Sequence, residues 1–560
     1  MLEDKIRLEM SDWLYNSGLV GLYNILKESG DDVLAEEYYI EFSPSSLNDF
    51  EEKYFNYFIN KYEKSLSWHK IISYEGLIEY YEENDFKDFD EDSLKKLNDY
   101  IKDTVKYYLK SNSYKAAYDL IDSDMDILSL EKKLSIIKIK KNESIEDIIP
   151  QVKDTFEILK LVINYCKSKD GKRYLAGKNV IYTIIRNAWD GICFLNPQTK
   201  EKDMYIDYKN YFVNPVEEYI SFDKSKLKYN CFVCDGKMKD FKNDLSFLKE
   251  TGFDVSRKSS HVWDFNNDVA ICPICKLVYS CVPAGIAYVF NKGLYINDNS
   301  SMKNAIKINN KVKSEILKEH EIKSSLTYRA LVSSINEQFN DKTKYELADI
   351  QVVRFEGEKY RFNILSRKSL QVINNSRDDL NKLIKCGFKE VNTYFNIYDL
   401  VIDSLLNNQN LFILIHKLLV YKLSIPKNCQ FATSHVVRML NINFRFLEGV
   451  GYMEKLEKDS IQKANISGYY LREDYKGKKS ENKLNGIAYR LLNALKTNNK
   501  DMFMDTILNC YLYVRKEVPS IFLDALRDDL AFKTIGYAFV TGLIEGKEDT
   551  NKNGGINNGK

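Results

Sequence analysis

The chain is poor in several residue types that mark particular classes of protein. It has 8 prolines and 5 histidines among 560 residues, and 82 basic against 81 acidic residues leave a net charge of +1. A free-standing nucleic-acid-binding protein usually has a clear basic excess. Any nucleic-acid binding by this chain must therefore use local basic patches or neighbouring subunits of an assembly.

Long hydrophobic runs are also missing from the sequence. No stretch approaches 18 apolar residues, so we expect no transmembrane helix and no membrane partner. The segment Leu411–Leu423 is apolar but short and contains His416 and Lys417, which predicts a buried helix. The first residues lack a basic stretch followed by an apolar one, so we expect a cytoplasmic protein. Ten cysteines are too few for a disulfide-based scaffold.

Common catalytic signatures do not occur. There is no G-x-S-x-G and no H-E-x-x-H motif, and the histidines lack metal-ligand spacing. The glycine-bearing segment 167–179 nearly matches a phosphate-binding loop, but Asn179 stands where magnesium binding requires Ser or Thr. A deaminase signature fails too, because Trp263 occupies the place of the required Glu.

Two cysteine pairs carry the strongest chemical signal. They are Cys231-Phe-Val-Cys234 and Cys272-Pro-Ile-Cys275, with 37 residues between Cys234 and Cys272. Each C-x-x-C turn directs two sulfurs to one side, and two such turns complete a tetrahedral shell around one zinc ion. An iron–sulfur cluster and a thioredoxin-like redox motif are the alternatives. Zinc with four protein ligands has no open coordination position and would be structural.

A second interpretation of the cysteine pairs is a zinc-supported HNH-like nuclease. Such folds often carry two knuckles around a His and an Asn, and His261, Asn266 and Asn267 precede the second pair. His261 is only eleven residues before Cys272, which leaves little room for the strand and loop of such a site. Lys276 also stands where a polar metal ligand would be needed. We therefore keep the nuclease as the alternative function and expect no enzyme.

Hydrophobic periodicity predicts an α+β, predominantly helical protein. The first 30 residues read as a helix that Gly18 and Gly21 interrupt or tighten, and Tyr38–Phe42 reads as a strand. Residues 350–364 predict a β-hairpin around Gly357. Beyond residue 366 the pattern is almost wholly helical. The predicted parts are an N-terminal α+β domain (1–229), a zinc-binding CxxC–CxxC subdomain (230–283), the rest of the α+β domain (284–366), a helical bundle (367–545) and a disordered tail (546–560).

Two further local predictions concern caps and cores. Ser376 and Asp379 resemble a capping box at a helix start. The insert between the cysteine pairs contains apolar residues that could form a small core, namely Phe241, Leu245, Phe247, Leu248 and Phe253.

Two basic, glycine-bearing segments are candidates for nucleic-acid contact. The first is predicted to be a loop with Lys172, Arg173, Lys178 and Asn179, which could reach phosphates or base edges. The second, 472–483, is predicted to lie between helices, where Lys476, Lys478 and Lys479 could bind a displaced strand. Ordinary solvated loops would look the same, because exposed Lys and Arg are common.

Three segments together resemble a known protein family. They are Ser11–Val20 (SDWLYNSGLV), Asn230–Cys234 (NCFVC) and Ala270–Pro283 (AICPICKLVYSCVP). The chain resembles the CXXC–CXXC family of CRISPR-associated proteins, the large subunit of type I-B Cascade, over its whole length. A type I-A assignment is not excluded by the sequence.

The resemblance implies a noncatalytic role in antiviral defence. Such subunits help recognise the short protospacer-adjacent motif (PAM) beside the target, assist opening of the double-stranded target DNA and stabilise the R-loop. The implied partners are the crRNA, the backbone subunits, the subunit that holds the crRNA 5' end, the small subunits and a helicase-nuclease recruited afterwards. Guide pairing would read the target sequence, as in other RNA-guided systems.

Overall fold

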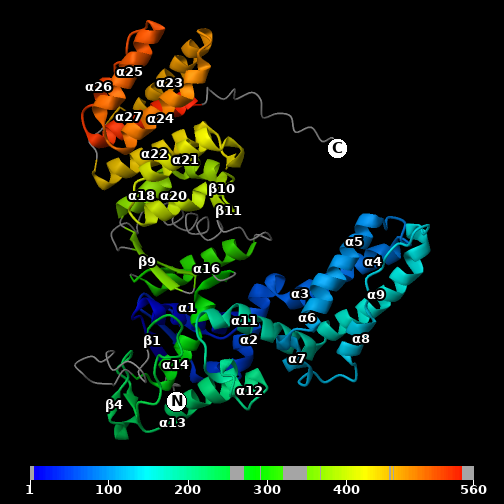
Figure 1. Ribbon diagram of the computed structural model, residues 1–560. Helices are drawn as coiled ribbons and strands as arrows, with labels where there is room; N and C mark the ends of the chain where they lie inside the picture. Colours follow the sequence, from blue (N-terminus) through cyan, green and yellow to red (C-terminus); the bar gives the residue numbers. More distant parts are fainter. Residues whose placement is uncertain are drawn as a thin grey trace. The chain divides into compact units, whose positions relative to one another are not determined.

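The structure, a computed structural model, describes residues 5–252, 270–289, 292–299, 301–318, 350–357, 359–365, 367–452, 456–457 and 459–544. The chain divides into two units (Figure 1): unit 1 holds residues 1–318 and 353–362, and unit 2 holds residues 319–352 and 363–560. Helices dominate both and the sheets are small, so the predicted fold class is confirmed. Within the described ranges, none of the helices combines the length and apolar character that crossing a membrane requires.

Unit 1 begins with a small antiparallel sheet of three strands, ordered β1-β3-β2, and the first helix follows β1 in the chain. The strands of unit 1 are β1 (Ile6–Glu9), β2 (Val33–Ala35), β3 (Tyr39–Phe42), β4 (Tyr229–Asn230), β5 (Lys237–Met238), β6 (Ala287–Val289) and β7 (Lys292–Asn297), together with most of β8 (Ile350–Glu356) and β9 (Lys359–Leu365), whose outer residues fall in unit 2. The helices of unit 1 are α1 (Trp13–Glu28), α2 (Phe50–Tyr62), α3 (Ser67–Ile72), α4 (Glu75–Glu83), α5 (Glu91–Asp99), α6 (Tyr107–Leu109), α7 (Asn112–Tyr118), α8 (Ile127–Lys133), α9 (Ile145–Lys167), α10 (Lys169–Gly171), α11 (Gly177–Thr183), α12 (Met204–Tyr208), α13 (Asn214–Ser221), α14 (Pro273–Ser280), α15 (Val282–Gly285) and α16 (Met302–Lys318).

Helix α1 starts where the sequence supplies a cap. The Asp12 carboxylate accepts hydrogen bonds from the backbone N–H groups of Leu14 and Tyr15, at 2.8 and 3.2 Å, which satisfies donors that a helix start leaves unpaired. The predicted helix is thus confirmed, as is the strand at Tyr38–Phe42, observed as β3. The helix runs without a break through Gly18 and Gly21, so the predicted interruption was wrong.

The glycines of α1 instead allow backbone contact with α14 and α15. A Cβ atom at Gly21 would overlap the carbonyl oxygen of Cys281, and one at Gly285 would overlap the carbonyl oxygen of Ser17. A Cβ at Gly18 would press on the Val278 carbonyl. No other residue fits at these positions without moving one helix away from the other, because the obstructing atoms are backbone.

Aromatic side chains also hydrogen-bond to the backbone of α14 and α15. The Tyr54 hydroxyl and the Trp189 indole N–H both donate to the carbonyl oxygen of Ser280, at 2.8 and 3.1 Å. The Tyr57 hydroxyl donates to the carbonyl oxygen of Ala284 at 3.2 Å. These buried donors satisfy carbonyl groups at helix ends that would otherwise lose their partners.

The predicted β-hairpin is confirmed as β8 and β9, which form a four-stranded sheet with order β6-β7-β8-β9. Gly357 lies in its turn with φ +57°, a conformation that other residues rarely adopt. The Trp13 ring packs edge-on against Tyr360 and Phe362, with centroids 5.0 and 5.2 Å apart, and this joins α1 to β9.

The described residues of unit 2 after 366 form helices and one small sheet. They are α18 (Arg367–Asn375), α19 (Arg377–Leu383), β10 (Gly387–Glu390), β11 (Thr393–Asn396), α20 (Ile397–Leu406), α21 (Phe412–Ser424), β12 (Cys429–Gln430), α22 (Thr433–Val450), α23 (Ser460–Gly477), α24 (Leu484–Lys496), α25 (Lys500–Val514), α26 (Ile521–Ala525) and α27 (Asp529–Ile544). The predicted helix at Leu411–Leu423 is α21. The sheet, ordered β11-β10-β12, was missed by the prediction of an almost wholly helical region.

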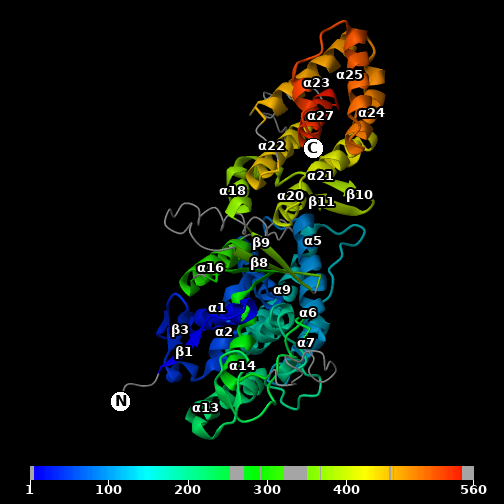
Figure 2. The ribbon, with the colours of Figure 1, turned by 90° about the vertical axis from the view of Figure 1, so that its left-hand side faces the viewer.

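Two interactions organise unit 2. Helices α23 and α27 lie side by side (Figure 2), because Gly468 and Gly542 let each backbone touch the other.

The predicted capping box at Ser376 is wrong, since its side chain caps no N–H group. Asp379 instead accepts hydrogen bonds from Arg438 and Arg445 on α22, at 3.1 and 2.6 Å, and these charged partners bind a carboxylate better than backbone amides do.

We expect Gly21→Ala to destabilise unit 1 by about 3 kcal/mol, because the new methyl group meets backbone that cannot yield. Urea unfolding followed by circular dichroism measures this. Gly76→Ala is the matched control, since Gly76 lies in α4 with open space around its Cβ position. It should stabilise the protein by roughly 0.5–1 kcal/mol. Equal effects of the two substitutions would contradict the contact described.

Lys313 is a buried lysine that connects α16 with α2 and α15. Its ammonium group donates to the Tyr57 hydroxyl at 3.2 Å and to the carbonyl oxygen of Ala284. Burial lowers the pKa of Lys313 to about 7, with a smaller contribution from the positive charge of Lys61, and Glu28 opposes the shift. The folded protein therefore disfavours the protonated amine that the unfolded chain carries.

The stability of the protein should consequently rise with pH above 7. Up to a pH of about 10 the unfolded chain keeps a proton on Lys313 that the folded chain has lost, which adds about 1.4 kcal/mol per pH unit. Lys313→Met should remove this contribution from the free energy of unfolding, measured in urea at several pH values. Lys307→Met, an exposed position on the same helix, should leave the slope unchanged. A wild-type slope retained in Lys313→Met would refute the assignment.

Candidate metal centre

The first cysteine pair lies in the turn between β4 and β5. The Cys231 backbone N–H donates to the carbonyl oxygen of Gly236 at 2.8 Å, and the Val233 N–H points at the Cys231 sulfur at 3.5 Å. Asp235 closes the turn in the left-handed region, with φ 55°. The short loop between two antiparallel strands therefore turns both sulfurs toward one side.

The second pair begins a helix. Cys272 is the residue before α14, and its sulfur accepts a hydrogen bond from the Cys275 N–H at 3.4 Å, in place of the usual oxygen cap. Pro273 occupies the first helical position, where its missing N–H costs nothing. Both sulfurs of this pair thus lie at the positive end of a helix, whose dipole favours thiolates. The neighbouring thiols, followed by burial, nevertheless raise the pKa of both Cys272 and Cys275.

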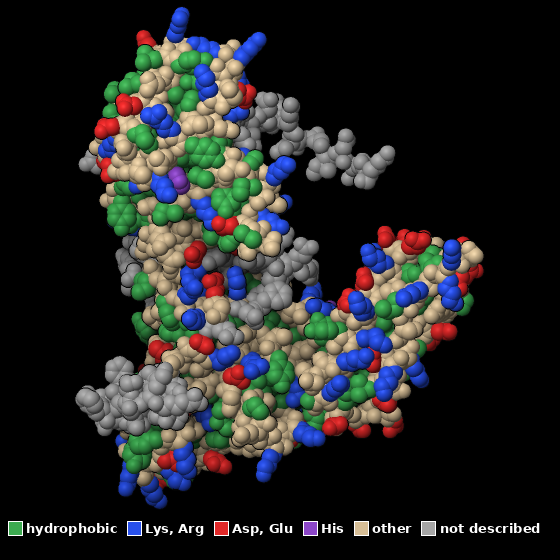
Figure 3. Space-filling view, in the orientation of Figure 1, with side chains coloured by type: hydrophobic (Ala, Val, Ile, Leu, Met, Phe, Trp, Pro, Cys, Tyr) green, Lys and Arg blue, Asp and Glu red, His purple; other side chains and the backbone are tan. Residues whose placement is uncertain are grey.

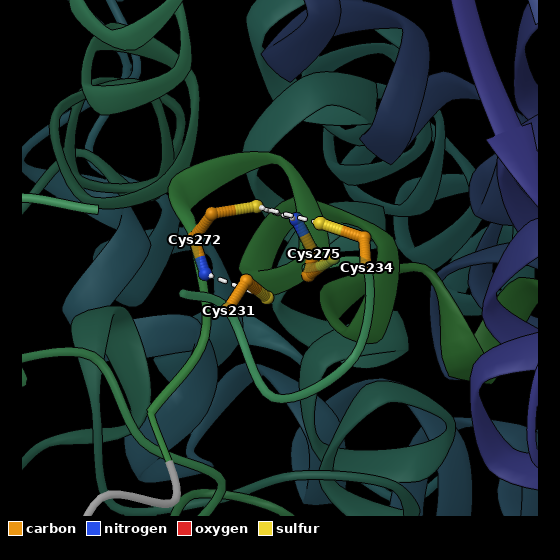
Figure 4. Close-up of side chains that lie close together, drawn as sticks. All are labelled: Cys231, Cys234, Cys272 and Cys275. Atoms are coloured by element: carbon orange, nitrogen blue, oxygen red, sulfur yellow. Dashed lines mark hydrogen bonds between the residues drawn. The ribbon is translucent and has the colours of Figure 1, made fainter. Parts of the chain in front are cut away.

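The two pairs converge on one centre. Their four sulfur atoms all lie within 4.8 Å of one another, and the Cys234 and Cys272 sulfurs face each other at 3.7 Å (Figure 4). Four sulfurs 2.3 Å from a central zinc ion would lie about 3.8 Å apart. The cysteines are free and not disulfide-bonded. They are positioned to bind one metal ion, and among the described residues they are the only such group.

Backbone N–H and thiol groups donate hydrogen bonds to the Cys231 sulfur, and these stabilise the thiolate form that binds a cation. The Cys272 N–H donates to the Cys231 sulfur at 3.2 Å, which ties the second pair to the first. The pKa of the Cys231 thiol is lowered, because hydrogen bonds from Cys234, Cys272 and Cys275 and from that backbone N–H favour its thiolate. Three of the sulfurs belong to buried residues and only Cys234 is exposed, so the site opens to solvent on one side.

Tyr15 contacts the centre from α1 and was not predicted from the sequence. Its hydroxyl lies 3.7 Å from the Cys275 sulfur, and burial, followed by the nearby Cys275, raises the pKa of Tyr15 well above its usual value. The hydroxyl therefore stays protonated and can donate to a thiolate ligand. Tyr15 lies in the segment Ser11–Val20, which contributes to the family resemblance. Nothing in the spacing of that segment connects Tyr15 with a cysteine 260 residues away in sequence.

The insert between the pairs packs on the rest of unit 1. Leu245, Phe247 and Leu248 are buried, as predicted, and residues 247–249 hydrogen-bond to the backbone next to Trp189. Phe241 is 40% exposed, so its predicted core position was wrong. Phe253 lies outside the described residues.

The first basic segment is helical, and the predicted loop was wrong. Residues 167–183 pass from α9 through α10, a wider turn at Lys172–Ala176 and α11. A Cβ at Gly171 would meet the Tyr165 carbonyl and one at Gly177 would meet Met204, so these glycines serve helix packing. The sequence could not show the second contact, because Met204 lies on α12, whereas Tyr165 lies close to Gly171 in the sequence.

The side chains of this segment are engaged within unit 1. Arg173 binds Glu52 at 2.6 Å and lies over the Tyr205 ring at 3.7 Å. The buried Asn179 side chain accepts from the Trp68 backbone N–H at 2.9 Å. Lys172 lies over the Trp68 ring at 5.6 Å, and burial lowers the pKa of Lys178. Nucleic-acid contact by these four residues stays a prediction.

The second basic segment is also mostly helical. Arg472 to Gly477 form the end of α23, and only residues 478–480 connect it to the next turn. Lys476 pairs with Glu473 at 2.8 Å, and Lys478 lies 5.0 Å above the Tyr513 ring. Lys479 is exposed, with φ 54°. This group lies in unit 2, and its binding of a displaced strand stays a prediction.

The residues of the nuclease alternative, His261, Asn266 and Asn267, lie outside the described residues, as does Trp263. The structure therefore supplies no geometry for that reaction.

The site and fold together define an α+β protein with a four-cysteine metal-binding segment. Residues 224–287, which contain both cysteine pairs, match the model of the family described as CRISPR-associated protein (Cas_CXXC_CXXC). The match supports a CRISPR-associated protein of the CXXC–CXXC type. Neither the curated proteins nor the solved structures contain a match to the chain.

Replacing one ligand should remove the metal and unfold its surroundings. We expect Cys231→Ser and Cys275→Ser each to lose the bound metal and to destabilise unit 1 by several kcal/mol, measured by plasma mass spectrometry and thermal unfolding. Cys281→Ala is the control, because that buried thiol lies near the second pair but outside the four-sulfur group. It should keep its metal. Well-folded wild-type protein without metal would overturn the assignment.

Proposed function

We propose that this protein is the noncatalytic large subunit of a crRNA-guided type I-B Cascade complex. One observation carries the proposal: the segment that matches the CRISPR-associated family is the one in which the four cysteines converge. The start of the chain, Ser11–Val20, adds support, because it forms the helix that contacts this centre through Tyr15.

The bound metal is proposed to be zinc with a structural role. Four thiolates suit zinc and fill its coordination shell, so no position is open for water or substrate. When bound, zinc supplies a cross-link between the hairpin of the first pair and the start of α14. The protein residues would hold it: the helix end and the Cys272 N–H favour thiolates, and the Tyr15 hydroxyl, 3.7 Å from the Cys275 sulfur, could donate to that sulfur once it is a thiolate.

In this role the cytoplasmic protein recognises the motif adjacent to the target, assists duplex opening and stabilises the R-loop. Its partners are the crRNA, the backbone and small subunits, the subunit that holds the crRNA 5' end, double-stranded target DNA and a helicase-nuclease recruited afterwards. A net charge of +1 suits a subunit whose affinity comes from local patches and neighbours. Lys476, Lys478 and Lys479 remain proposed contacts for the displaced strand. Lys172, Arg173, Lys178 and Asn179 remain proposed contacts for phosphates or base edges.

Co-purification tests the proposal. We expect the affinity-tagged chain, expressed with the proteins of its genomic neighbourhood and a CRISPR array, to elute with those subunits and with crRNA, identified by sequencing. The assembled complex should bind duplex DNA that carries a matching target and leave it uncut.

The opposite result has a defined form. If the purified chain alone nicked DNA in a metal-dependent reaction, and if His261→Ala abolished the nicking, the nuclease would replace the subunit as the function. Elution without any guide RNA would equally contradict the proposal.

A further inference from the structure

The outer side of the first cysteine pair is basic and aromatic. Within residues 224–242 there are six lysines and two aspartates, and Figure 3 shows blue side chains gathered around green ones at the β4 end of unit 1. We call this the knuckle surface and define it by Lys224, Lys226, Lys228, Tyr229, Phe232, Lys237, Lys239, Phe241 and Lys242. It was not among the basic segments predicted from the sequence, because its lysines are spread between cysteines and aromatic residues.

Three aromatic rings of the knuckle surface are open to solvent. Phe232, the residue after the first cysteine of the pair, is 48% exposed, although phenylalanine normally avoids water. Tyr229 and Phe241 are each 40% exposed and contact one another with centroids 4.2 Å apart. The turn that directs the sulfurs inward thus directs Phe232 outward. None of the three rings is buried in the core of unit 1.

The lysines around these rings make few contacts within the protein. Lys226 and Lys242 lie 4.0 and 3.6 Å from Asp223 and Asp240 and stay 78% and 86% exposed, so these pairs hold them weakly. Within the described residues, Lys228 and Lys239 have no hydrogen-bond or ion-pair partner. A filled four-thiolate zinc centre carries two negative charges. The two charges of that centre and the three aspartates Asp223, Asp235 and Asp240 leave the six lysines with a small positive surplus.

We propose that the knuckle surface binds single-stranded nucleic acid. Unpaired bases can stack on exposed aromatic rings, whereas a duplex hides their faces, and lysines beside the rings would neutralise the phosphates. The net positive charge disfavours a basic partner. The exposed rings provide a surface on which bases can stack, which an ordinary solvated patch of lysines lacks. The inference rests on the proposed function for its biological setting, but its binding chemistry can be tested separately.

The test measures binding of the full-length, metal-loaded protein to fluorescein-labelled oligo-uridine and oligo-thymidine of about 12 nucleotides by fluorescence anisotropy. Phe232→Ala should weaken binding about tenfold, as expected for the loss of one stacked base. Lys228→Glu combined with Lys239→Glu should make the slope of log K against log salt shallower by about 1.4. Metal analysis of each variant confirms that the cysteine centre is intact.

Matched controls lie elsewhere in unit 1. Tyr107 on α6 is 68% exposed, and Tyr107→Ala should not change the affinity; neither should Lys95→Glu combined with Lys102→Glu. Losses in these controls equal to those in the knuckle variants would overturn the inference. So would equal weakening of a blunt duplex by Phe232→Ala, since stacking would then not explain it. A larger loss with either RNA or DNA supports the inference and identifies which strand binds.

Failure of this inference is distinguishable from failure of the proposed function. If crRNA elutes with the assembled complex but Phe232→Ala leaves oligonucleotide binding unchanged, only the knuckle surface is refuted. If no crRNA elutes while the knuckle variants still lose oligonucleotide binding, the surface stands and the Cascade assignment falls.

Discussion

The structure of unit 1 depends on backbone contact between α1 and the helices that follow the second cysteine pair. Gly18 and Gly21 on α1 meet the backbone of α14 and α15, and Gly285 meets α1 in return. Contact this close leaves no room for a side chain at these three positions, so it fixes how near the helices approach one another. The contact of α1 with α14 and α15 therefore also positions the metal-ligand candidates Cys272 and Cys275 at the start of α14.

The metal centre is therefore part of the core of unit 1. Helix α14 is held at both ends: its N-terminal side carries Cys272 and Cys275, and its C-terminal carbonyl at Ser280 receives Tyr54 and Trp189. Cys231, Cys272 and Cys275 are buried with the surrounding apolar residues. Metal binding and core packing consequently stabilise the same state, so loss of either is transmitted to the other by mass action.

The sequence allowed prediction of what depends on near neighbours. The C-x-x-C turns, the hairpin around Gly357 and the helix at Leu411–Leu423 follow from local patterns. Several failures have a distant partner as their cause, although the missed pairing of β10 with β11 is local. Gly177 looks like a loop residue until Met204 on α12 is known to press on it. Asp379 looks like a cap residue until Arg438 and Arg445 arrive from α22, 59 and 66 residues later.

The first cysteine pair illustrates how one short segment can have two faces. A C-x-x-C turn must point its sulfurs to one side, so the residues between and beside them are forced toward the other side. In a segment with only a structural task, selection for solubility would favour polar residues there. This chain instead places Phe232 between the cysteines and Tyr229 just before them, with Lys228 and Lys239 close by. A metal bound by the four cysteines would make this turn rigid, and a base would stack with less loss of entropy on a ring that is already fixed.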